Sequence, residues 1–469
     1  MNVFKRFIST EYMVKPEIRK GDIPSSREAY GKTLRIAIPA VIEMVSITLM
    51  DMVDAMMVGR WLGSYAMTAV GITGQPRMLI LSVFMALNIA LTAIIARKKG
   101  AGDMESARSC LRHGLMLNIV LGLKITFLAI LFAHPLMRLA RAQPDTIYYA
   151  ASYFRIMSLI LIPQVITMTI CVAQRVIGNT KVALKVNVTA KIVAVVLNFL
   201  LIEGRFGFPR LEIDGVAWAR SIAALVAFGL ALASILHKDS PLRLTLKDSW
   251  RPCKDMLKTI GKQASNGLLE QVGLRIGFFV YAMVIAELGT DAFAAHFIAQ
   301  QLMVLSFTFA DGIGAATTGL VGQNLGKGRS DLSIMYGKIG LRLALVCAAL
   351  LSTFCILFRF RFAAIFAPDY PDVVQAAGGL ILILAYALPF QTTQLVMGGS
   401  LRGAGDTRYV AITMMITVGV LRPFFGFLFA FPLGLGLAGA WITVIIDQMV
   451  RLAMLLTRFM KGKWTEAKV

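Results

Sequence analysis

Long apolar stretches separated by short polar breaks make up almost all of this 469-residue chain. A helix needs roughly 20 apolar residues to cross the hydrocarbon core of a bilayer, and twelve stretches meet that requirement. We therefore expect an all-α polytopic membrane protein with twelve transmembrane helices. The expected helices cover residues 33–58, 66–96, 113–133, 147–171, 182–203, 214–236, 258–287, 293–323, 335–358, 374–397, 408–430 and 437–459.

The longest polar break lies between the sixth and seventh expected helices and divides the chain into two halves. It reads HKDSPLRLTLKDSWRPCKDM. The pattern predicts a cytoplasmic tail over 1–32, an N-lobe over 33–236, a cytoplasmic linker over 237–257, a C-lobe over 258–459 and a second cytoplasmic tail over 460–469.

The two halves also repeat each other. LGSYAMTAVGITGQ in the first half returns as LGTDAFAAHFIAQQ in the second, and RVIGNT returns as RGAGDT at nearly the same offset. Gly100 and Gly102 match Gly326 and Gly328 in the same alignment. Because six is an even number of helices, both halves enter the membrane from the same side. We expect two pseudo-symmetric lobes related by an axis along the membrane normal.

Composition supports a membrane protein, and the placement of charge supports one orientation. Charged residues are 16% of the chain, against about 25% in soluble proteins. With the N-terminus in the cytoplasm, the outer loops hold few of the 48 basic residues: Arg60, Arg138, Arg141, Arg205, Arg210, Arg359 and Arg361. The net charge of +22 is therefore a positive-inside signature. We expect a cell (inner) membrane location with both termini cytoplasmic, contact with anionic lipid, and no nucleic-acid partner.

Neither the cysteines nor the glycine-rich turns indicate an enzyme or a metal centre. No two of the five cysteines form a close pair with metal-ligand spacing. The loops GAGD, GKGR and RGAGDT follow no strand and lack a GK[ST] motif, so they do not predict a phosphate site. Glycine suits tight turns between helices. We expect no catalytic residue, no metal and no cofactor.

The first expected helix carries three carboxylates. Glu43 and Asp54 are eleven residues apart, which places them about 20° apart around a helix and roughly 16 Å apart along it. Asp51 lies about 60° from Asp54. A charge at the bilayer centre costs roughly 2.5–3.5 kcal/mol on insertion scales. This acidic face therefore meets either a wet cleft, where it could bind a coupling ion, or a structural partner such as Lys191.

Other ionisable residues lie within the second half. Glu270 is expected to lie at a depth in the membrane similar to that of Glu43. Asp447 and Arg451 have the spacing of a structural i, i+4 pair. Arg275 and Arg422 need acceptors, for which Glu270 and Asp447 are the candidates. The residues expected to line a cleft between the two lobes are Glu43, Glu270, Gln271, Arg275, His296, Asp311, Tyr386 and Gln391. For Glu43, Glu270 and Asp311 a packing role stays open as the alternative, and for His296 a hydrogen-bonded packing role is the preferred interpretation.

Several motifs together resemble one family. PAVIEMVSITLMDMVDAMMVGRWLGSYAMTAVG, GAGD, AAHFIAQQ, ATTGLVGQNLGKGR and LRGAGDT resemble the multidrug and toxic compound extrusion (MATE) transporters of bacterial type, over about residues 33–459. The resemblance implies two six-helix lobes around a cleft that opens alternately to each side. It also implies export of organic compounds driven by an inward flow of Na⁺ or H⁺.

The resemblance assigns roles to some residues of the first helix. Asp54 in VDAMMVG resembles the functional aspartate of the family, Pro39 resembles the proline at which that helix bends, and Gly59 closes the motif as a structural residue.

The fifth expected helix departs from the family pattern. Ala194 and Asn198 stand where many members have an asparagine and an aspartate, and Lys191 lies one turn before Ala194. The expected coupling group is therefore Asp54, Asp51, Lys191 and Asn198, with Lys191 placed to pair with one of the two aspartates.

The sequence thus predicts a secondary active exporter of small organic substrates, cationic ones among them, working as a monomer. The alternative is a flippase of the same superfamily for a lipid-linked or anionic precursor. Basic residues within the helices favour this alternative, and the acidic face of the first helix opposes it.

Overall fold

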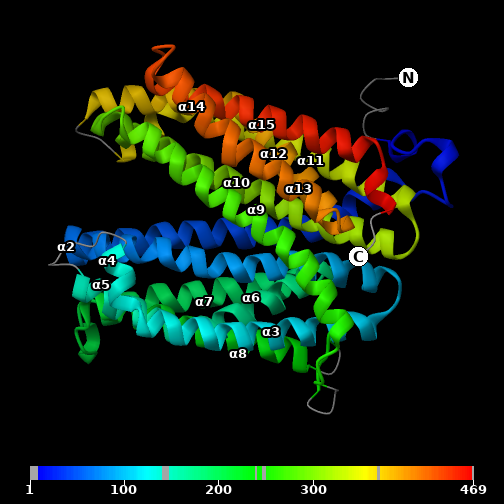
Figure 1. Cartoon of the computed structure of the whole chain (residues 1–469), viewed down its shortest axis with the longest axis horizontal. Coiled ribbons are helices and arrows are strands. Elements are labelled where there is room, and N and C mark those ends of the chain that lie inside the picture. The colour runs from blue at the N-terminus through cyan, green and yellow to red at the C-terminus, as the bar shows by residue number, and fades with distance from the viewer. Residues whose placement is uncertain (1–8, 140–146, 238–239, 246–249, 367–369, 467–469) are drawn as a thin grey trace.

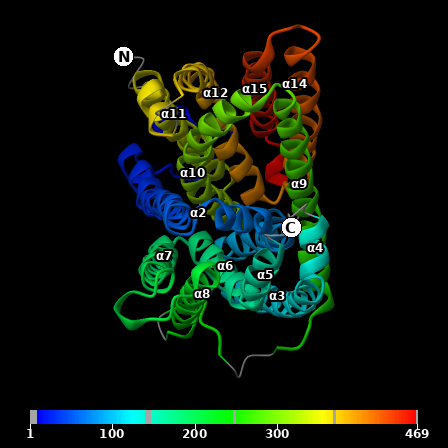
Figure 2. The ribbon, with the colours of Figure 1, turned by 90° about the vertical axis from the view of Figure 1, so that its left-hand side faces the viewer.

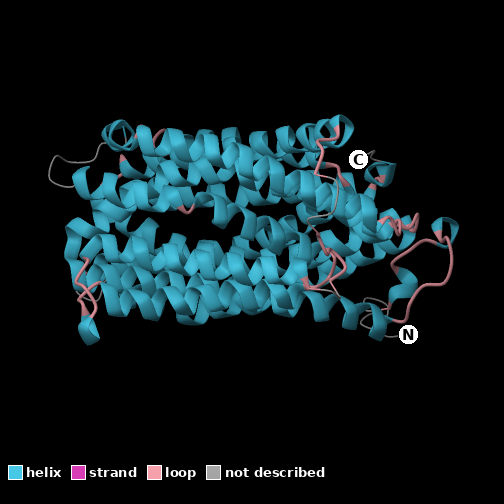
Figure 3. Ribbon diagram, turned by 90° about the horizontal axis from the view of Figure 1, so that it is seen from below, coloured by secondary structure: helices cyan, strands magenta, loops and turns pink. Residues whose placement is uncertain are grey.

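The computed structural model describes residues 9–139, 147–237, 240–245, 250–366 and 370–466, apart from most side chains between 55 and 75. Every regular element in these ranges is helical (Figure 3). The first half contains α2 (Ser26–Gly100), α3 (Met104–Leu131), α4 (Ala133–Leu139), α5 (Ile147–Leu159), α6 (Leu161–Val176), α7 (Thr180–Leu201) and α8 (Glu212–Leu236). The second half contains α9 (Lys254–Ala286), α10 (Thr290–Gly326), α11 (Ser330–Phe366), α12 (Pro371–Ala404), α13 (Thr407–Met414), α14 (Arg422–Ala430) and α15 (Gly436–Met460). A π-helical segment, Met415–Leu421, joins α13 to α14.

Helix α2 is one helical element of 75 residues, where the sequence predicts two helices. Both of its ends lie beside the turn between α10 and α11. The backbone nitrogen of Lys20, just before α2, donates to Asp331 over 3.1 Å, and Gly100 at its end packs against Gln323. The chain therefore doubles back within α2. The dark-blue arm and the lighter-blue arm of this helix both run along the long axis of the molecule in Figure 1. The two arms are the candidate spans Ser26–Asp54 and Pro76–Gly100.

The predicted number of crossings is confirmed once a bent pair is counted as one. In the described residues, eleven helices are long and apolar enough to span a membrane, and α5 with α6 forms one further crossing bent by 51°. The sequence predicts one straight helix over 147–171. The break falls at Ile160, where α6 begins anew with Pro163 in its first turn. A proline is tolerated there because the first-turn N–H groups have no partner within the helix.

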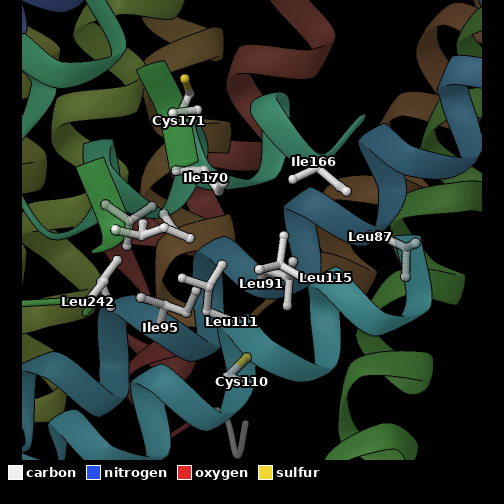
Figure 4. Close-up of a cluster of buried hydrophobic side chains, with 14 of the residues drawn as sticks. Leu87, Leu91, Ile95, Cys110, Leu111, Leu115, Ile166, Ile170, Cys171 and Leu242 are labelled. Carbon is white, nitrogen blue, oxygen red and sulfur yellow. The ribbon is translucent and has the colours of Figure 1, made fainter. Parts of the chain in front are cut away.

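The helices form two lobes, with α2 to α8 in one and α9 to α15 in the other, and α2 of the first lobe contacts α9 and α10 of the second (Figures 1 and 2). In the first lobe, Leu91 of α2, Leu111 of α3 and Ile170 of α6 are almost fully buried in one apolar cluster (Figure 4). In the second, Trp441 and Ile381 lie at the centre of a comparable cluster. Lipid is as apolar as these side chains, so close packing stabilises each lobe more than removal from water does.

Two glycines bring the lobes together at one end of the molecule. A Cβ atom on Gly100 would lie 1.8 Å from the carbonyl oxygen of Gln323, and one on Gly326 would lie 1.9 Å from that of Arg97. Gly100 matches Gly326 in the repeat, and Arg97 matches Gln323 at the same shift. Each repeat therefore makes the same contact with the other, as a two-fold axis between the lobes requires. Gln323 Nε2 also donates to the backbone oxygen of Val176 over 2.5 Å. This end, which the charge pattern predicts to face the cytoplasm, is closed.

The glycine-rich loops are the tight turns that the sequence predicts. Gly102 and Gly328, which match in the repeat, have φ angles of 80° and 75°. Gly178 and Gly405, the second matching pair, have φ angles of 91° and 90°. A side chain disfavours this left-handed conformation, so glycine ends these helices.

Replacing Gly405 by alanine is expected to lower the stability of the protein by roughly 1–2 kcal/mol, the cost of a left-handed conformation for a residue with a Cβ atom. The neighbouring Asp406 accepts a hydrogen bond from Arg458 Nε over 2.7 Å, so Asp406→Ala should also destabilise this turn. Thermal unfolding in detergent measures both. Saturable nucleotide binding by the wild type that either change removes would instead indicate a phosphate site.

The N-terminal segment is more than the polar tail predicted over 1–32. Met13 and Val14 are 1% and 2% exposed, and they pack with Leu320 and Met335 of the C-lobe. Lys338 Nζ donates to the backbone oxygen of Met13 over 2.6 Å. The segment therefore lies against the C-lobe before the chain enters α2.

Candidate functional site

A cavity of about 1180 Å³ lies between the lobes. Its N-lobe wall comes from α2 and α6, and its C-lobe wall from α9, α10, α12, Met414 at the end of α13 and Arg451 of α15. Most of the lining is apolar, rich in methionine and phenylalanine: Met44, Met85, Met168, Phe278, Phe279, Met303, Phe307 and Met414. Flexible methionines and flat aromatic rings adapt to ligands of different shape. Of the predicted cleft residues, Glu270, Gln271, Arg275 and Asp311 line this cavity.

A smaller cavity of about 200 Å³ continues the first toward the closed end. Asp311, Arg175 and Arg402 line it together, from α10, α6 and α12. The Asp311 side chain is exposed to this space and makes no hydrogen bond or ion pair with the residues that the structure describes. The packing alternative for Asp311 therefore finds no support, and a carboxylate without a fixed partner among those residues stands where the two lobes meet.

The two arginines beside Asp311 belong to matching ion pairs. Arg402 Nη1 lies 2.7 Å from Glu270 Oε1, and Arg175 Nη1 lies 3.9 Å from Glu43 Oε1. The shift that relates Arg175 to Arg402 also relates Glu43 to Glu270. The internal repeat thus places one glutamate–arginine pair on each side of the lobe interface. The C-lobe pair is tight and the N-lobe pair is loose, because Glu43 also accepts from Asn187 Nδ2 over 2.6 Å.

The acidic face of the first helix meets a polar face of α7. Asn187 and Asn198 donate to Glu43 and Asp54 at the same sequence separation of 144 residues, which is the register of two parallel helices. Between these contacts, Lys191 forms an ion pair with Asp51. Of the two environments that the sequence leaves open, Glu43 and Asp54 therefore meet a partner helix and are buried, whereas Asp51 stays half exposed beside Lys191. The predicted pairing of Lys191 with one of the aspartates is confirmed.

Asp54 is held more closely than Asp51. Its side chain is 1% exposed, Asn198 Nδ2 donates to Oδ1 over 2.9 Å, and Arg220 Nε lies 3.4 Å from Oδ2. Arg220 also donates to the hydroxyl of Tyr153 over 2.5 Å. Oδ2 itself accepts no hydrogen bond from the residues described. Asp54 is thus a buried carboxylate with one oxygen available for a proton and one basic neighbour.

We expect Lys191→Ala to slow export several-fold, because Asp51 loses its ion-pair partner and the contact between α2 and α7 becomes weaker. The side chains of Lys191 and Asp51 are 28% and 53% exposed, so the change in stability should stay small. An unchanged export rate from reconstituted vesicles would contradict a role for the pair, and Lys185→Ala, on the same helix, is the control.

The pair predicted between Asp447 and Arg451 is part of a buried triad. Asp447 Oδ1 lies 2.5 Å from Arg451 Nη2, and Oδ2 lies 2.5 Å from Arg422 Nη2. Arg451 Nε also donates to Thr417 Oγ1 in the π-helical segment, over 2.9 Å. Arg422 therefore has the acceptor Asp447, as expected. Glu270, the other candidate acceptor, pairs with Arg402, and Arg275 pairs with neither carboxylate.

Four predicted cleft residues lie outside the cavity lining, and one of them is Glu43, which meets Asn187 of α7 instead. His296 is 5% exposed and accepts from Trp441 Nε1 over 3.1 Å, so it packs inside the C-lobe. Gln391 is fully buried and donates to Ser306 Oγ over 2.8 Å. Tyr386 is 62% exposed and does not line either cavity. Pro39 lies within α2 without interrupting the helix, and the surroundings of Gly59 fall outside the described side chains.

Sequence reasoning missed the partners Arg175, Arg220 and Arg402. Two of them stood in the repeat motif, at the same shift as Glu43 and Glu270, so the matching shifts could have paired them. Arg220 lies inside the sixth expected helix, where an arginine needs a partner. No group of three or more His, Cys, Asp or Glu side chains in the described part of the chain is placed to hold a metal ion.

Comparisons with known proteins agree with this architecture. The MatE family model matches residues 39–200 and 268–428, one block in each lobe. A probable multidrug resistance protein NorM from Thermotoga maritima is 26% identical over 471 residues, covering 100% of this chain and 97% of the relative.

Two solved structures share the fold. One, described as the outward-facing conformation of a multidrug resistance MATE family transporter, superposes with a TM-score of 0.86 at 22% identity, covering 93% of this chain and 97% of that one. The other is a MOP superfamily transporter from Pyrococcus furiosus, described by the reverse polarity of its binding pocket. It gives a TM-score of 0.87 at 22% identity and covers 94% and 97% of the two chains. Two repeated lobes, a cleft between them and a family match in each half lead to one conclusion: this chain belongs to the MatE family of multidrug and toxic compound extrusion transporters.

Proposed function

We propose that this protein exports organic compounds by alternating access of its two lobes, with Asp311 as the counter-ion for cationic substrates and a proton as the coupling ion. The observation that carries the proposal is the cavity between the lobes. It is large, mostly apolar and shared by both repeats, and its closed end holds a carboxylate with no fixed partner among the described residues. A cationic group of the substrate gains an ion pair there without breaking one.

The surroundings of Asp54 support a proton over sodium. A sodium ion at Asp54 would lie close to the Arg220 guanidinium, 3.4 Å from Oδ2, and the two like charges would repel. A proton on Oδ2 instead neutralises the carboxylate and weakens its attraction for Arg220. Since Asp54 lies on α2 and Arg220 on α8, protonation would loosen α2 within the N-lobe and so favour one of the two states.

The flippase alternative is the weaker of the two. A cleft for a strongly anionic precursor needs an excess of positive charge. Of the three arginines that line the large cavity, Arg402 and Arg451 are each bound to a carboxylate, and Arg275 shares the cavity with one free carboxylate, Asp311. The pairing supports an exporter of mixed or cationic compounds.

We propose that this multi-pass transporter lies in the cell membrane with both termini in the cytoplasm, an orientation that the charge pattern supports, and that it acts as a monomer beside anionic lipid. In that orientation the closed end faces the cytoplasm, and the cavity belongs to an outward-facing state. Accessibility of the exposed Cys253 to a membrane-impermeant thiol reagent, in intact cells and in inverted vesicles, tests the orientation.

Transport into inverted membrane vesicles tests the function. We expect a fluorescent organic cation to accumulate when the vesicle interior is made acidic, and not when only a sodium gradient is imposed. Vesicles without the protein are the control. Accumulation driven by sodium alone would refute the proton, and accumulation under neither gradient would refute export.

A further inference from the structure

One basic side chain in the cleft wall has no carboxylate partner among the residues that the structure describes. Arg275 lies on α9 and lines the large cavity. Its only polar contact in the described part of the chain joins Nη2 to the sulfur of Met78, over 3.7 Å and across to the N-lobe. Its Nε is buried without an acceptor there. A thioether is a weak acceptor, so this guanidinium retains most of its capacity to bind an anion.

The other basic groups between and within the lobes make the contrast clear. Carboxylates lie within ion-pair distance of six of them: Arg175, Lys191, Arg220, Arg402, Arg422 and Arg451. Arg77 of α2, which does not line the cavity, instead donates to the amide oxygen of Gln164 over 2.9 Å. A charge removed from water is costly unless a partner compensates it. Within the described ranges, the fold meets that requirement at these six groups, and at Arg275 it does not.

We propose that Arg275 is an anion-binding subsite of the cleft, which takes the carboxylate, sulfonate or phosphate group of an amphiphilic molecule. The inference rests on the proposed role of the cavity as the transport cleft. Gln271 lies one turn before Arg275 on α9, and Phe278 and Phe279 lie about one turn after it; all three line the same cavity. A guanidinium forms two parallel hydrogen bonds with a carboxylate or phosphate, and the aromatic rings accept a flat apolar body.

The subsite extends the substrate range beyond cations. Asp311 and Arg275 line one cavity from α10 and α9, and neither is bound to an opposite charge in the described part of the chain. The cleft therefore offers one free group of each sign, and a zwitterionic amphiphile can use both. A molecule with only a cationic group forms an ion pair with Asp311 and does not bind Arg275.

Two dyes that differ by one methyl ester test the subsite. Rhodamine 110 has a free carboxylic acid, and rhodamine 123 is its methyl ester. Equilibrium binding of each to the full chain in neutral phosphatidylcholine nanodiscs is measured by fluorescence polarisation at neutral pH, without any ion gradient. We expect Arg275→Gln to weaken binding of the acid about tenfold, the loss of one charge-assisted hydrogen-bonded pair, and to change binding of the ester less than about twofold.

The variants are chosen to separate a lost charge from a lost fold. Arg275→Lys keeps the charge and should retain much of the affinity for the acid. Arg361→Gln removes an exposed arginine of α11 that does not line the cavity and should change neither dye. Equal losses for both dyes in Arg275→Gln, or no loss for either, would overturn the subsite. If the wild type binds neither dye, the transport cleft itself is wrongly assigned, and the subsite falls with it.

A further arm identifies the source of the anion. Phosphatidylglycerol added to the nanodiscs competes with rhodamine 110 in the wild type, and not in Arg275→Gln, if a lipid headgroup occupies the subsite. If phosphatidylglycerol leaves the binding of rhodamine 110 unchanged, the subsite serves soluble amphiphiles. Under both outcomes, the proposal requires that Arg275→Gln weaken the binding of rhodamine 110.

Discussion

Replacing Asp54 by asparagine is expected to reduce gradient-driven export to the level of vesicles that lack the protein. Asparagine has the same shape and can still accept from Asn198, but it cannot take up a proton. The buried side chain of Asp54 lies 3.4 Å from Arg220 and 2.9 Å from Asn198. Without protonation at this position, the contacts of α2 do not change when the proton gradient is imposed. The gradient then favours neither the inward-facing nor the outward-facing state. Substrate binding without a gradient should persist, because Asp54 does not line the cavity.

The same change is expected to destabilise the protein, since Arg220 loses its carboxylate. Breaking a buried ion pair costs roughly 3–5 kcal/mol, although the hydrogen bond from Arg220 to Tyr153 remains. The double variant Asp54→Asn with Arg220→Gln removes the unpaired charge, so it should recover stability without recovering export. Export by the single variant at the wild-type rate would refute coupling at Asp54. Recovery of export in the double variant would show that Asp54 only compensates Arg220.

Replacing Gly326 by alanine is expected to drive the lobes apart at the closed end. The new Cβ atom would lie 1.9 Å from the backbone oxygen of Arg97, and backbone atoms cannot move aside as a flexible side chain can. Overpacking of this kind costs about 1–3 kcal/mol, which changes the ratio of two states by roughly 5- to 150-fold. Gly100→Ala should act in the same way, because it meets Gln323 in the matching contact.

A distance measurement between the lobes detects this change in the ratio of the two states. Spin labels at Lys181 and Arg408 occupy exposed, matching positions of the two repeats, with Cys253 replaced by serine. Gly326→Ala should lengthen the distance between the labels and lower the export rate. Gly261→Ala is the control, because a Cβ atom there meets no atom within 4 Å. A wild-type distance distribution in Gly326→Ala would show that the closed end does not depend on this contact.

The closed end also shows which part of an interface between the lobes a sequence repeat can predict. The repeated motifs predict that Gly100 and Gly326 are equivalent. They do not predict that Gly100 of α2 packs against α10 and that Gly326 of α10 packs against α2. Equivalent positions imply a two-fold axis between the lobes, but they do not give the distance between the lobes. That separation comes from side chains and backbone of α2 and α10 packed together, and only the folded molecule shows it.

The intramembrane charges divide in a similar way. The cost of a charge in lipid predicts that each has a partner or a wet surface. The pair of Arg451 with Asp447 follows from its spacing, and that of Lys191 with Asp51 from the family resemblance of the first and fifth helices. The partners of Glu43, Asp54 and Glu270 do not, because Arg175, Arg220 and Arg402 come from helices far away in the sequence. Placement of Gln391 in the cleft was wrong for a related reason, and His296 takes the packing role instead of the cleft role. A polar residue in a membrane helix can satisfy its hydrogen bonds inside a lobe, and helical periodicity does not separate the two environments.

The sequence by itself determined the twelve crossings, the duplicated halves, the expected orientation and the glycine turns. Each of these depends on local apolar length, charge counts or backbone freedom, which are properties of short segments. The tertiary structure alone decided which end is closed, which carboxylates are bound to arginines, and which groups stay unpaired in the described part of the cleft. Pairing of buried charges depends on distances of a few ångströms between helices that are distant along the chain. For that reason Asp311 and Arg275, which the sequence shows only as two more charges in apolar helices, emerge from the described structure as the free charged groups of the cavity.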